Sequence, residues 1–374
     1  MNILLVGEYS GVHSELAKAL RELGHEVVVC SDGDSYKEFE RDITISANPV
    51  RSRFGAYFNI VKDYIGIRGL LLYRKKRDVL KQLQGFDVVQ LINPMALECF
   101  GSLANIFLLN NLSKNNKKIF LCALGDDYCW VNACLSNKFK YSAMSRLKLR
   151  TTHRYLYSLR YVYGVFFKQL NKLCIDTSEK IIPGLYDYWY AYCDNPKCTG
   201  VVPLPISSNK YVHPSKTKYP VKIFHGWQQG KELRKGNDIF SEAVQQLIAE
   251  LGPELVEYSE VKSVPFSEYQ KCFFDADIFL DQCFSYDRGM NALLGMAAGK
   301  VVFSGFDSHA NKSALTHIGI NATPCSVEIF NELKNLILNI ETIDSIKQSA
   351  YAYAVEIHDS HTVARQYLKI WGES

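Results

Sequence analysis

The feature that most constrains this chain is an alternation, in two successive series, of short apolar runs with helical patterns. In the first series the apolar runs lie at 3–6, 25–30, 86–92, 118–124 and 180–183. In the second they lie at 221–224, 254–260, 276–280 and 300–304, with helical patterns at 237–250, 267–274, 290–298 and 327–338. This alternation is typical of parallel sheets with crossover helices. The chain is therefore predicted to be α/β, with two Rossmann-like domains.

The boundary between the two domains is predicted at a stretch rich in proline and polar residues. Pro203 and Pro205 precede Ser207, Ser208 and Asn209, a composition that suits an interdomain linker. We expect an N-terminal domain at 1–205, a C-terminal domain at 206–350, and a helix at 351–374 that packs back toward the N-terminal domain. Because ligands of such folds bind at the carboxyl ends of the strands, the domains should face each other across a ligand-binding cleft.

Composition excludes several classes of protein. With 47% hydrophobic and 22% charged residues the chain is predicted to be globular rather than disordered. The N-terminus lacks a basic region before its short apolar run, and no stretch is long enough to cross a bilayer. The 11 cysteines form no Cys-x-x-Cys pair, so we expect buried thiols in a reducing cytoplasm, without disulfides or zinc.

Two motifs in the second half suggest a site for a diphosphate. Gly226 ends an apolar run, and Arg234 and Lys235 follow at the start of a helix, where two cations can neutralise a leaving group. A solvated basic loop is the alternative interpretation. Gly289 opens a second helix through Met290 and Asn291, whose free N–H groups and dipole would hold an anion. Close helix-to-sheet packing by small residues is the alternative there.

The order and spacing of these and other motifs resemble the two-domain (GT-B) glycosyltransferases of the group 1 type, along nearly the whole chain. The resemblance rests on Val6-Gly7-Glu8-Tyr9-Ser10-Gly11, Gly125-Asp126-Asp127, Ile182-Pro183-Gly184, Pro203-Leu204-Pro205, Arg234-Lys235-Gly236, Val264-Pro265-Phe266 and Gly289 through Val302. It implies transfer of a sugar from a nucleoside diphosphate sugar to a sugar acceptor.

The resemblance also implies roles for individual residues. Lys235, helped by Arg234, would contact the donor diphosphate, together with the amides at Gly289. The backbone at Val264 and Pro265 would read the nucleobase. The acceptor would meet the first loop, at Gly7, Tyr9, Ser10 and Gly11. No metal or other cofactor is expected, because the cations and helix amides stabilise the departing diphosphate.

The sequence departs from this family's pattern at one pair of positions. Where the family usually carries two glutamates eight residues apart, this chain has Tyr286 and Leu294. Asp287 is the local substitute for the first glutamate, so Tyr286 and Asp287 are the candidate catalytic residues of this loop. Asp127, at the end of a predicted strand, is the candidate base if the enzyme inverts. Asp32-Gly33-Asp34 has a metal-binding pattern but is interpreted as a turn.

Positive charge is concentrated in the first half of the chain. Residues 1–200 carry 27 Lys and Arg against 19 Asp and Glu, whereas residues 201–374 carry 16 against 20. No acidic residue lies between Tyr128 and Ile175, where cations alternate with tyrosines, and 74–77 is a second basic run. A solvated helix face and a nucleic-acid surface are alternatives. We favour an anionic membrane surface and a lipid-linked acceptor, with no nucleic-acid partner.

The sequence thus predicts a cytoplasmic glycosyltransferase, peripheral at the inner face of the membrane, in surface polysaccharide or glycan biosynthesis. A degenerate glycosyltransferase that serves as a non-catalytic binding or scaffold subunit is the first alternative, motivated by Tyr286 and Leu294. A nucleotide-dependent oxidoreductase is disfavoured, because the loop from Gly7 to Gly11 lacks the Gly-x-Gly-x-x-Gly spacing.

Overall fold

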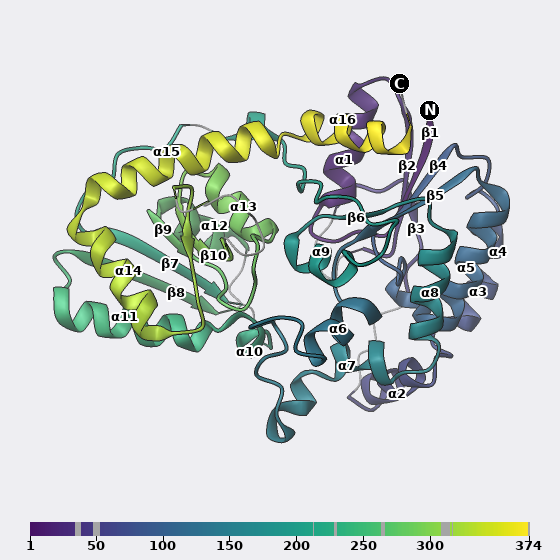
Figure 1. Ribbon diagram of the computed structural model, residues 1–374, viewed down its shortest axis with the longest axis horizontal. Helices are drawn as coiled ribbons and strands as arrows, with labels where there is room; N and C mark the ends of the chain where they lie inside the picture. The colour runs from purple at the N-terminus through teal and green to yellow at the C-terminus, as the bar shows by residue number, and fades with distance from the viewer. Residues whose placement is uncertain are drawn as a thin grey trace. The chain divides into compact units, whose positions relative to one another are not determined.

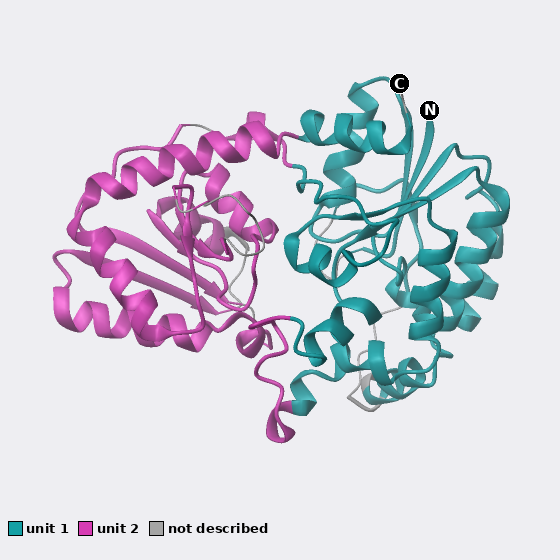
Figure 2. Ribbon diagram, viewed as in Figure 1, with its two compact units in different colours: residues 1–138, 152–205, 360–374 teal, residues 139–151, 206–359 magenta. Residues whose placement is uncertain are grey.

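The computed structural model describes residues 1–33, 39–47, 53–211, 213–227, 230–262, 266–307, 315 and 317–372. The chain divides into two compact units (Figure 2). Unit 1 comprises residues 1–138, 152–205 and 360–374, and unit 2 comprises residues 139–151 and 206–359. Within the described ranges, no helix combines the length and the apolar character needed to cross a bilayer.

Unit 1 is a parallel sheet covered by helices on both faces (Figure 1). The strands are β1 Asn2–Val6, β2 Glu26–Ser31, β3 Ile43–Thr44, β4 Val88–Leu91, β5 Lys118–Ala123 and β6 Ile181–Pro183, in the order β3-β2-β1-β4-β5-β6. The helices are α1 Val12–Glu22, α2 Arg53–Tyr64, α3 Leu70–Lys75, α4 Arg77–Leu80, α5 Gly101–Asn115, α6 Tyr128–Leu135, α7 Leu156–Tyr163, α8 Phe167–Thr177, α9 Tyr186–Tyr192 and α16 Ser360–Trp371. Short 3-10 turns lie at Glu98–Phe100 and Leu149–Arg154.

The last helix of the chain completes the core of unit 1. Trp371 and Tyr367 of α16 are 1% exposed and pack with Leu16 of α1 and with Ile3 and Leu5 of the central strand β1. Phe120 of β5 lies against Trp371, with ring centroids 6.3 Å apart. Burying side chains of this size stabilises the folded state by about 1.5–3 kcal/mol each. The helix α16 is therefore part of the core of unit 1.

Unit 2 is a second parallel sheet. Its strands are β7 Val221–Trp227, β8 Val256–Lys262, β9 Ile278–Leu280, β10 Val301–Ser304 and β11 Ile320–Asn321, in the order β11-β10-β9-β7-β8. The helices are α10 Glu232–Lys235, α11 Asn237–Leu251, α12 Phe266–Asp275, α13 Met290–Ala297, α14 Ser326–Leu338 and α15 Ile340–Ile357, and a 3-10 turn lies at Ser208–Lys210. A Cβ on Gly295 of α13 would lie 2.9 Å from the ring of Phe279, so small residues do bring this helix close to its sheet.

The predicted α/β class, with two parallel sheets, is confirmed, and each predicted strand appears with its ends shifted by at most a few residues. The two-residue edge strands β3 and β11 were not predicted. Residues 139–151 group with unit 2 although the sequence analysis placed them in the first domain. The longer segment of unit 2 begins at Ile206. The helix α15 ends at Ile357, and the chain returns to unit 1 at Ser360.

Candidate functional site

The carboxyl edge of the unit 2 sheet carries a buried ion pair. Asp281 directly follows β9, and its Oδ1 lies 2.6 Å from Nζ of Lys235, at the end of α10. The Asp281 side chain is 2% exposed and that of Lys235 is 20% exposed. Ser304, at the end of β10, donates a hydrogen bond to the other carboxylate oxygen of Asp281 at 3.3 Å. The ammonium of Lys235 is thus held at the ends of two adjacent strands.

A glycine fixes the turn that carries Lys235. Gly236 has φ 77°, a left-handed conformation that favours glycine, and separates α10 from α11. A Cβ on Gly236 would lie 2.2 Å from Sγ of Cys283. The backbone N–H of Cys283 donates to the carbonyl of Lys235 at 2.9 Å. The Arg234-Lys235-Gly236 motif therefore packs against the loop after β9. Arg234 is half-buried beside Lys235.

The N-terminus of α13 lies at the end of the same loop. Gly289 precedes the helix, and in the described residues no side chain caps it. Its φ of −72° suits any residue, and among the described residues a Cβ there would meet only Nε2 of Gln282, at 3.9 Å. Met290 is half-buried and Asn291 is exposed. The first N–H groups of a helix have no partner within it, so this end presents donors toward open space.

Tyr286 and Asp287 occupy structural positions in that loop. The Tyr286 hydroxyl accepts a hydrogen bond from the backbone N–H of Lys140 at 2.6 Å, and its ring packs edge-on against Tyr141 at 5.2 Å. Tyr286 thereby attaches the 139–151 segment to unit 2. The Asp287 carboxylate is 4% exposed and lies 3.1 Å from Nη1 of Arg288. Both side chains are therefore buried and engaged with neighbouring residues of unit 2.

A second polar network lies at the ends of β7 and β8. His225 is fully buried, accepts at Nε2 from Nδ2 of Asn237 and contacts the Tyr258 hydroxyl through Nδ1, both at 2.8 Å. Burial lowers the pKa of His225 to about 4, so the ring is neutral. Tyr258 donates to Oε2 of Glu260 at 3.0 Å, and Lys262 lies 2.8 Å from Oε1.

Glu260 was not identified from the sequence. Its side chain is 23% exposed, so part of the carboxylate faces solvent at the edge of the sheet. The nearby Gly226 packs under Tyr269, whose ring atom Cε2 would lie 2.6 Å from a Cβ at that position. Close packing against Tyr269 therefore accounts for the presence of a glycine at position 226. Val264 and Pro265, the predicted nucleobase contacts, lie outside the described residues.

In unit 1 the predicted acceptor loop caps α1. Gly7 has φ 86°, and a Cβ there would lie 2.4 Å from the carbonyl oxygen of Ala96. The Glu8 carboxylate accepts from the backbone N–H of Ser14 at 2.8 Å. His13 donates from Nδ1 to the carbonyl of Gly7 at 2.7 Å, and burial lowers its pKa to about 4.

The remaining residues of the loop are Tyr9, Ser10 and Gly11. Ser10 and Gly11 both have positive φ, of 55° and 86°, and Gly11 directly precedes α1. The Tyr9 ring lies against Gly125, where a Cβ would approach Cε2 to 2.9 Å. The loop is therefore held in one conformation by its backbone and by this packing.

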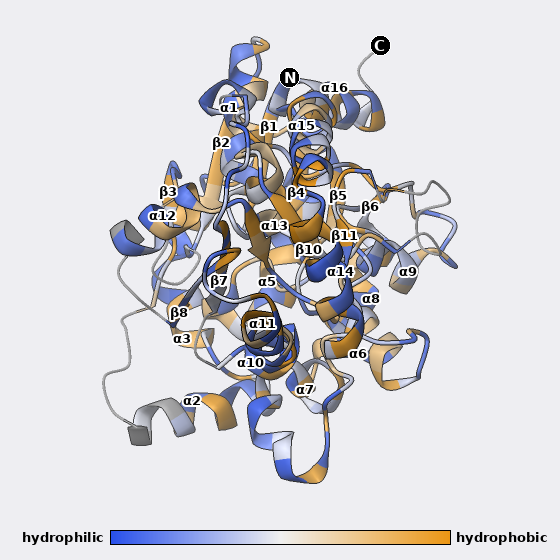
Figure 3. Ribbon diagram, turned by 90° about the vertical axis from the view of Figure 1, so that its left-hand side faces the viewer, coloured by the Kyte–Doolittle hydropathy of each residue, from blue (hydrophilic) through white to orange (hydrophobic). Residues whose placement is uncertain are grey.

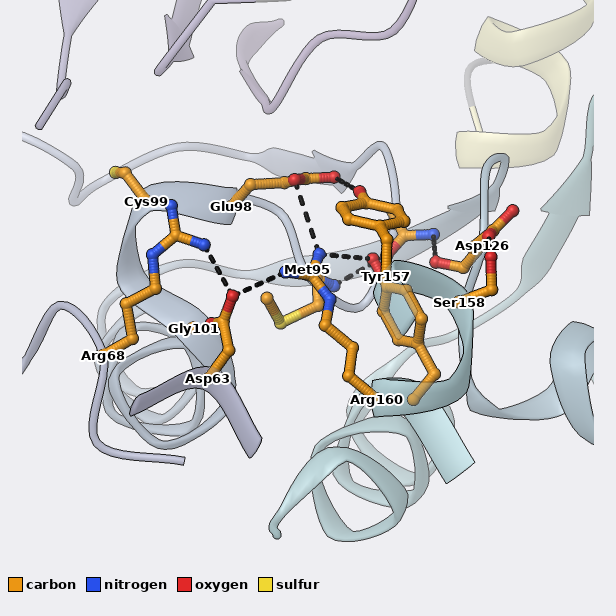
Figure 4. Close-up of polar contacts among 12 residues, drawn as sticks. Asp63, Arg68, Met95, Glu98, Cys99, Gly101, Asp126, Tyr157, Ser158 and Arg160 are labelled. Carbon is orange, nitrogen blue, oxygen red and sulfur yellow. Dashed lines mark hydrogen bonds and ion pairs between the residues drawn. The ribbon is translucent and has the colours of Figure 1, made fainter. Parts of the chain in front are cut away.

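The Tyr9 hydroxyl leads to a charged cluster that the sequence analysis missed (Figure 4). Tyr9 donates to Oε1 of Glu98 at 3.0 Å. Tyr157 donates to the same oxygen (Figure 4). Burial and the Glu98 carboxylate raise the pKa of Tyr9 well above its usual value. Nη2 of Arg160 lies 3.5 Å from Oε2 of Glu98. Glu98 follows β4, so these groups lie at the carboxyl edge of the unit 1 sheet.

Arg160 is the centre of this cluster. Its side chain is 4% exposed and pairs with Asp63 at 2.7 Å, and Asp63 also pairs with Arg68 at 2.6 Å. The guanidinium lies over the ring of Tyr157, 4.0 Å from its centroid. The sequence analysis counted Arg160 among the cations of a surface. That interpretation was wrong for Arg160, because the acidic partner comes from a helix far away in the sequence.

Asp126 and Asp127 have different surroundings after β5. Asp127 is 1% exposed, accepts from the N–H of Trp130 at 2.8 Å as the cap of α6, and accepts from the Tyr192 hydroxyl at 2.6 Å. Burial raises its pKa to about 6. This is a capping position within the core, where a substrate hydroxyl has no access. Asp126 is half-buried and accepts from Ser158 beside the Arg160 cluster (Figure 4).

Asp32 also lies at this edge, after β2. Its Oδ2 accepts from the backbone N–H of Cys99 at 2.7 Å, and burial raises its pKa to about 6. Within the described ranges, no group of three His, Cys, Asp or Glu side chains is placed to hold a metal ion.

The fold matches known structures along the full length of the chain. HepE of Anabaena, solved with UDP and glucose, has a TM-score of 0.60 at 13% identity, covering 100% of both chains. Sucrose-phosphate synthase of Thermosynechococcus elongatus has 0.59 at 11% identity, covering 99% of this chain and 98% of that one. A TarM variant of S. aureus, in complex with fondaparinux, alpha-GlcNAc-glycerol and UDP, has 0.62 at 8% identity over 100% and 99%.

These neighbours are GT-B glycosyltransferases, and this chain has their fold. No protein-family model matches the sequence, and no curated protein matches it at a significant level. At such low identity the likeness shows the fold alone.

Proposed function

We propose that this protein is a glycosyltransferase that moves a sugar from a nucleoside diphosphate sugar to a sugar acceptor. The proposal rests on the loop that joins β9 to α13, because Lys235 contacts its first residues and the uncapped N-terminus of α13 follows its end. The carboxylate of Asp281 lies 2.6 Å from the ammonium of Lys235. Among the described residues, the nearest atom to a Cβ built at Gly289 is Nε2 of Gln282, which directly follows Asp281, at 3.9 Å. An ammonium beside uncapped helix amides suits the charge of a diphosphate.

The donor would bind in unit 2. Lys235, Arg234 and the amides at Met290 and Asn291 would face the diphosphate, and the ribose would lie toward Glu260. Carboxylates commonly accept hydrogen bonds from ribose hydroxyls in such folds. Titration of nucleoside diphosphates tests this step, because a ligand that binds only the folded state raises its apparent stability.

The acceptor would bind in unit 1, at the loop from Gly7 to Gly11. Glu98 and Asp126 are two of the acidic groups at this edge, and carboxylates are suitable acceptors for sugar hydroxyls. The positive charge of the first half supports a lipid-linked acceptor, in surface polysaccharide or glycan biosynthesis. Release of free nucleoside diphosphate from a nucleotide sugar, only when acceptor is present, would verify transfer.

A second candidate function is a donor-binding subunit without turnover. It is favoured by the positions of Tyr286, which attaches the 139–151 segment, and of Asp287, which pairs with Arg288 at 3.1 Å. Neither offers an exposed carboxylate next to the donor. Binding of a nucleotide sugar without its consumption, across a panel of sugar acceptors, would select this alternative.

A further inference from the structure

Two helices of unit 1 expose apolar side chains and bury polar ones. In α2, Tyr57 and Phe58 are 69% and 60% exposed, whereas Asp63 is 4% exposed. In α7, Leu156 and Tyr163 are exposed, whereas Ser158 and Arg160 are buried together with Leu159 and Tyr161. A helix on the surface of a protein in water normally keeps its apolar residues toward the core, and the described side chains of α2 have the opposite arrangement. This arrangement has a cause inside the molecule, because Asp63 of α2 forms a buried ion pair with Arg160 of α7.

The two helices form one continuous surface. The Tyr64 hydroxyl donates to the carbonyl of Leu156 at 2.8 Å, and the N–H of Val165 donates to the carbonyl of Tyr64 at 2.7 Å. Figures 1 and 3 both place α2 beside α7. We call this surface the α2–α7 face. Its exposed apolar side chains include Tyr57, Phe58, Ile60, Leu156, Tyr163 and Val165.

Most charges around the α2–α7 face are positive, and the partly exposed carboxylate of Glu98 beside Tyr157 is paired with Arg160. Nζ of Lys62 lies 4.5 Å from the centroid of the Phe58 ring, and the exposed residues Arg154 and Lys168 lie just before α7 and in the first turn of α8. No acidic residue lies between Tyr128 and Ile175. The acidic residue of α2, Asp63, is buried and paired. An apolar surface with tyrosines and a cationic border is complementary to the interfacial region of an anionic bilayer.

We infer that the α2–α7 face binds an anionic lipid membrane, with Tyr57, Phe58 and Tyr163 inserted into the interfacial region and the surrounding cations near the headgroups. This goes beyond the proposed function and does not depend on it, because lipid binding requires neither a nucleotide sugar nor turnover. The charge pattern favours the membrane over a second copy of the chain, since two such faces would bring like charges together.

The experiment is flotation of the full chain with vesicles of phosphatidylcholine, with and without phosphatidylglycerol. Wild-type protein should float with the anionic vesicles and should be released as salt rises, because added salt screens the headgroup charges. The double variant Phe58→Ser/Tyr163→Ser should lose roughly tenfold or more in partitioning, since it removes two inserted rings. These side chains are exposed, so the variant should keep the melting temperature of the wild type.

The matched control is Val327→Ser/Leu338→Ser, which removes two apolar side chains that are 59% and 53% exposed on α14 of unit 2. It should float like the wild type. A second variant, Arg154→Gln/Lys168→Gln, should weaken binding to anionic vesicles and leave the neutral-vesicle result unchanged. Failure of the wild type to float with anionic vesicles overturns the inference. Flotation of Phe58→Ser/Tyr163→Ser to the same extent as the wild type also overturns it. A wild-type dimer that this variant abolishes, with no vesicle binding by either protein, overturns it as well.

Discussion

The ammonium of Lys235 lies 2.6 Å from the carboxylate of Asp281, a side chain that is 2% exposed. Lys235→Ala should therefore have two effects. It should weaken binding of a nucleoside diphosphate by about 1.5–3 kcal/mol, the range for a hydrogen bond to a charged group. It should also lower the free energy of unfolding, by no more than the roughly 3–5 kcal/mol typical of a broken buried pair, because Asp281 is left buried without its cation. Calorimetric titration and urea unfolding measure the two effects.

The double variant Lys235→Met/Asp281→Asn separates these effects. Removing both charges takes away the uncompensated carboxylate, so much of the stability should return. Nucleotide affinity should stay low, because the ammonium is still missing. Recovery of affinity together with stability would mean that Lys235 acts on the fold and makes no contact with the ligand.

Gly289→Ala should weaken nucleoside diphosphate binding without destabilising the protein. Its φ of −72° suits alanine, and within the described part of the chain the new Cβ would meet only Gln282, at 3.9 Å. The methyl group would instead occupy the space where the phosphate approaches the helix amides, and we expect a loss of roughly tenfold or more in affinity. Gly200→Ala, also in open space, is the matched control and should bind normally. If Gly289→Ala binds nucleoside diphosphates with unchanged affinity, the phosphate does not bind at the N-terminus of this helix.

The sequence predicted the sheets, and the positions of Lys235 and Gly289 beside one of them, because both depend on local patterns. Apolar runs place the strands, and parallel topology then brings Lys235 and Gly289 to the same edge. Glu98 and Arg160 were missed because their partners are distant in sequence: Arg160 pairs with Asp63, 97 residues away. A count of charges in a window cannot tell a cation that pairs inside the unit from one that faces water. Asp127 follows a strand as predicted, but its side chain caps α6 and is buried in the core.

Stability should fall as the pH is lowered from 7 to 5, partly because of His13. Its pKa is about 4 in the folded protein, against 6.5 for the free side chain. As the pH falls, His13 is therefore protonated in the unfolded chain before it is protonated in the folded protein. The contribution of neutral His13 to the free energy of unfolding is fully present above pH 6.5 and is lost as the pH falls toward 4. Linkage gives about 2 kcal/mol for this group between pH 7 and 5. In His13→Gln the drop in unfolding free energy should be smaller by that amount.

The exposed His153 provides the control for this effect, and His153→Gln should keep the wild-type pH dependence. Asp127 acts in the opposite direction, because its raised pKa of about 6 favours the folded state as the pH falls through that value. Only the difference between wild type and variant therefore reports on His13. An identical pH dependence in His13→Gln and wild type would show that His13 is protonated to the same extent in both states.

Arg160→Met should destabilise unit 1 by about 3–5 kcal/mol, because it leaves Asp63 buried without one of its two cations. Urea unfolding measures the loss. Lys168→Met, at an exposed position nearby, should change the unfolding free energy by no more than about 0.5 kcal/mol. Equal stability of the two variants would contradict the central place given to Arg160 in the cluster of Figure 4.

Sugar transfer should survive chelation of divalent metals. In the proposed donor site the diphosphate charge is met by Lys235, Arg234 and the amides of α13, so no cation from solution is needed. The measurement is release of nucleoside diphosphate in buffer with EDTA, compared with buffer containing Mg²⁺ or Mn²⁺. Turnover that stops in EDTA and returns with metal would overturn this reading of the phosphate site.

The most direct test of the donor site is isothermal titration of UDP, ADP, GDP, CDP and dTDP into the wild-type protein in the presence of EDTA. The account predicts saturable binding of at least one nucleoside diphosphate with one site per chain. That binding should be weakened in Gly289→Ala and in Lys235→Met/Asp281→Asn, and unchanged in Gly200→Ala. Absence of binding for all five nucleotides, or equal affinity in all four proteins, would contradict it.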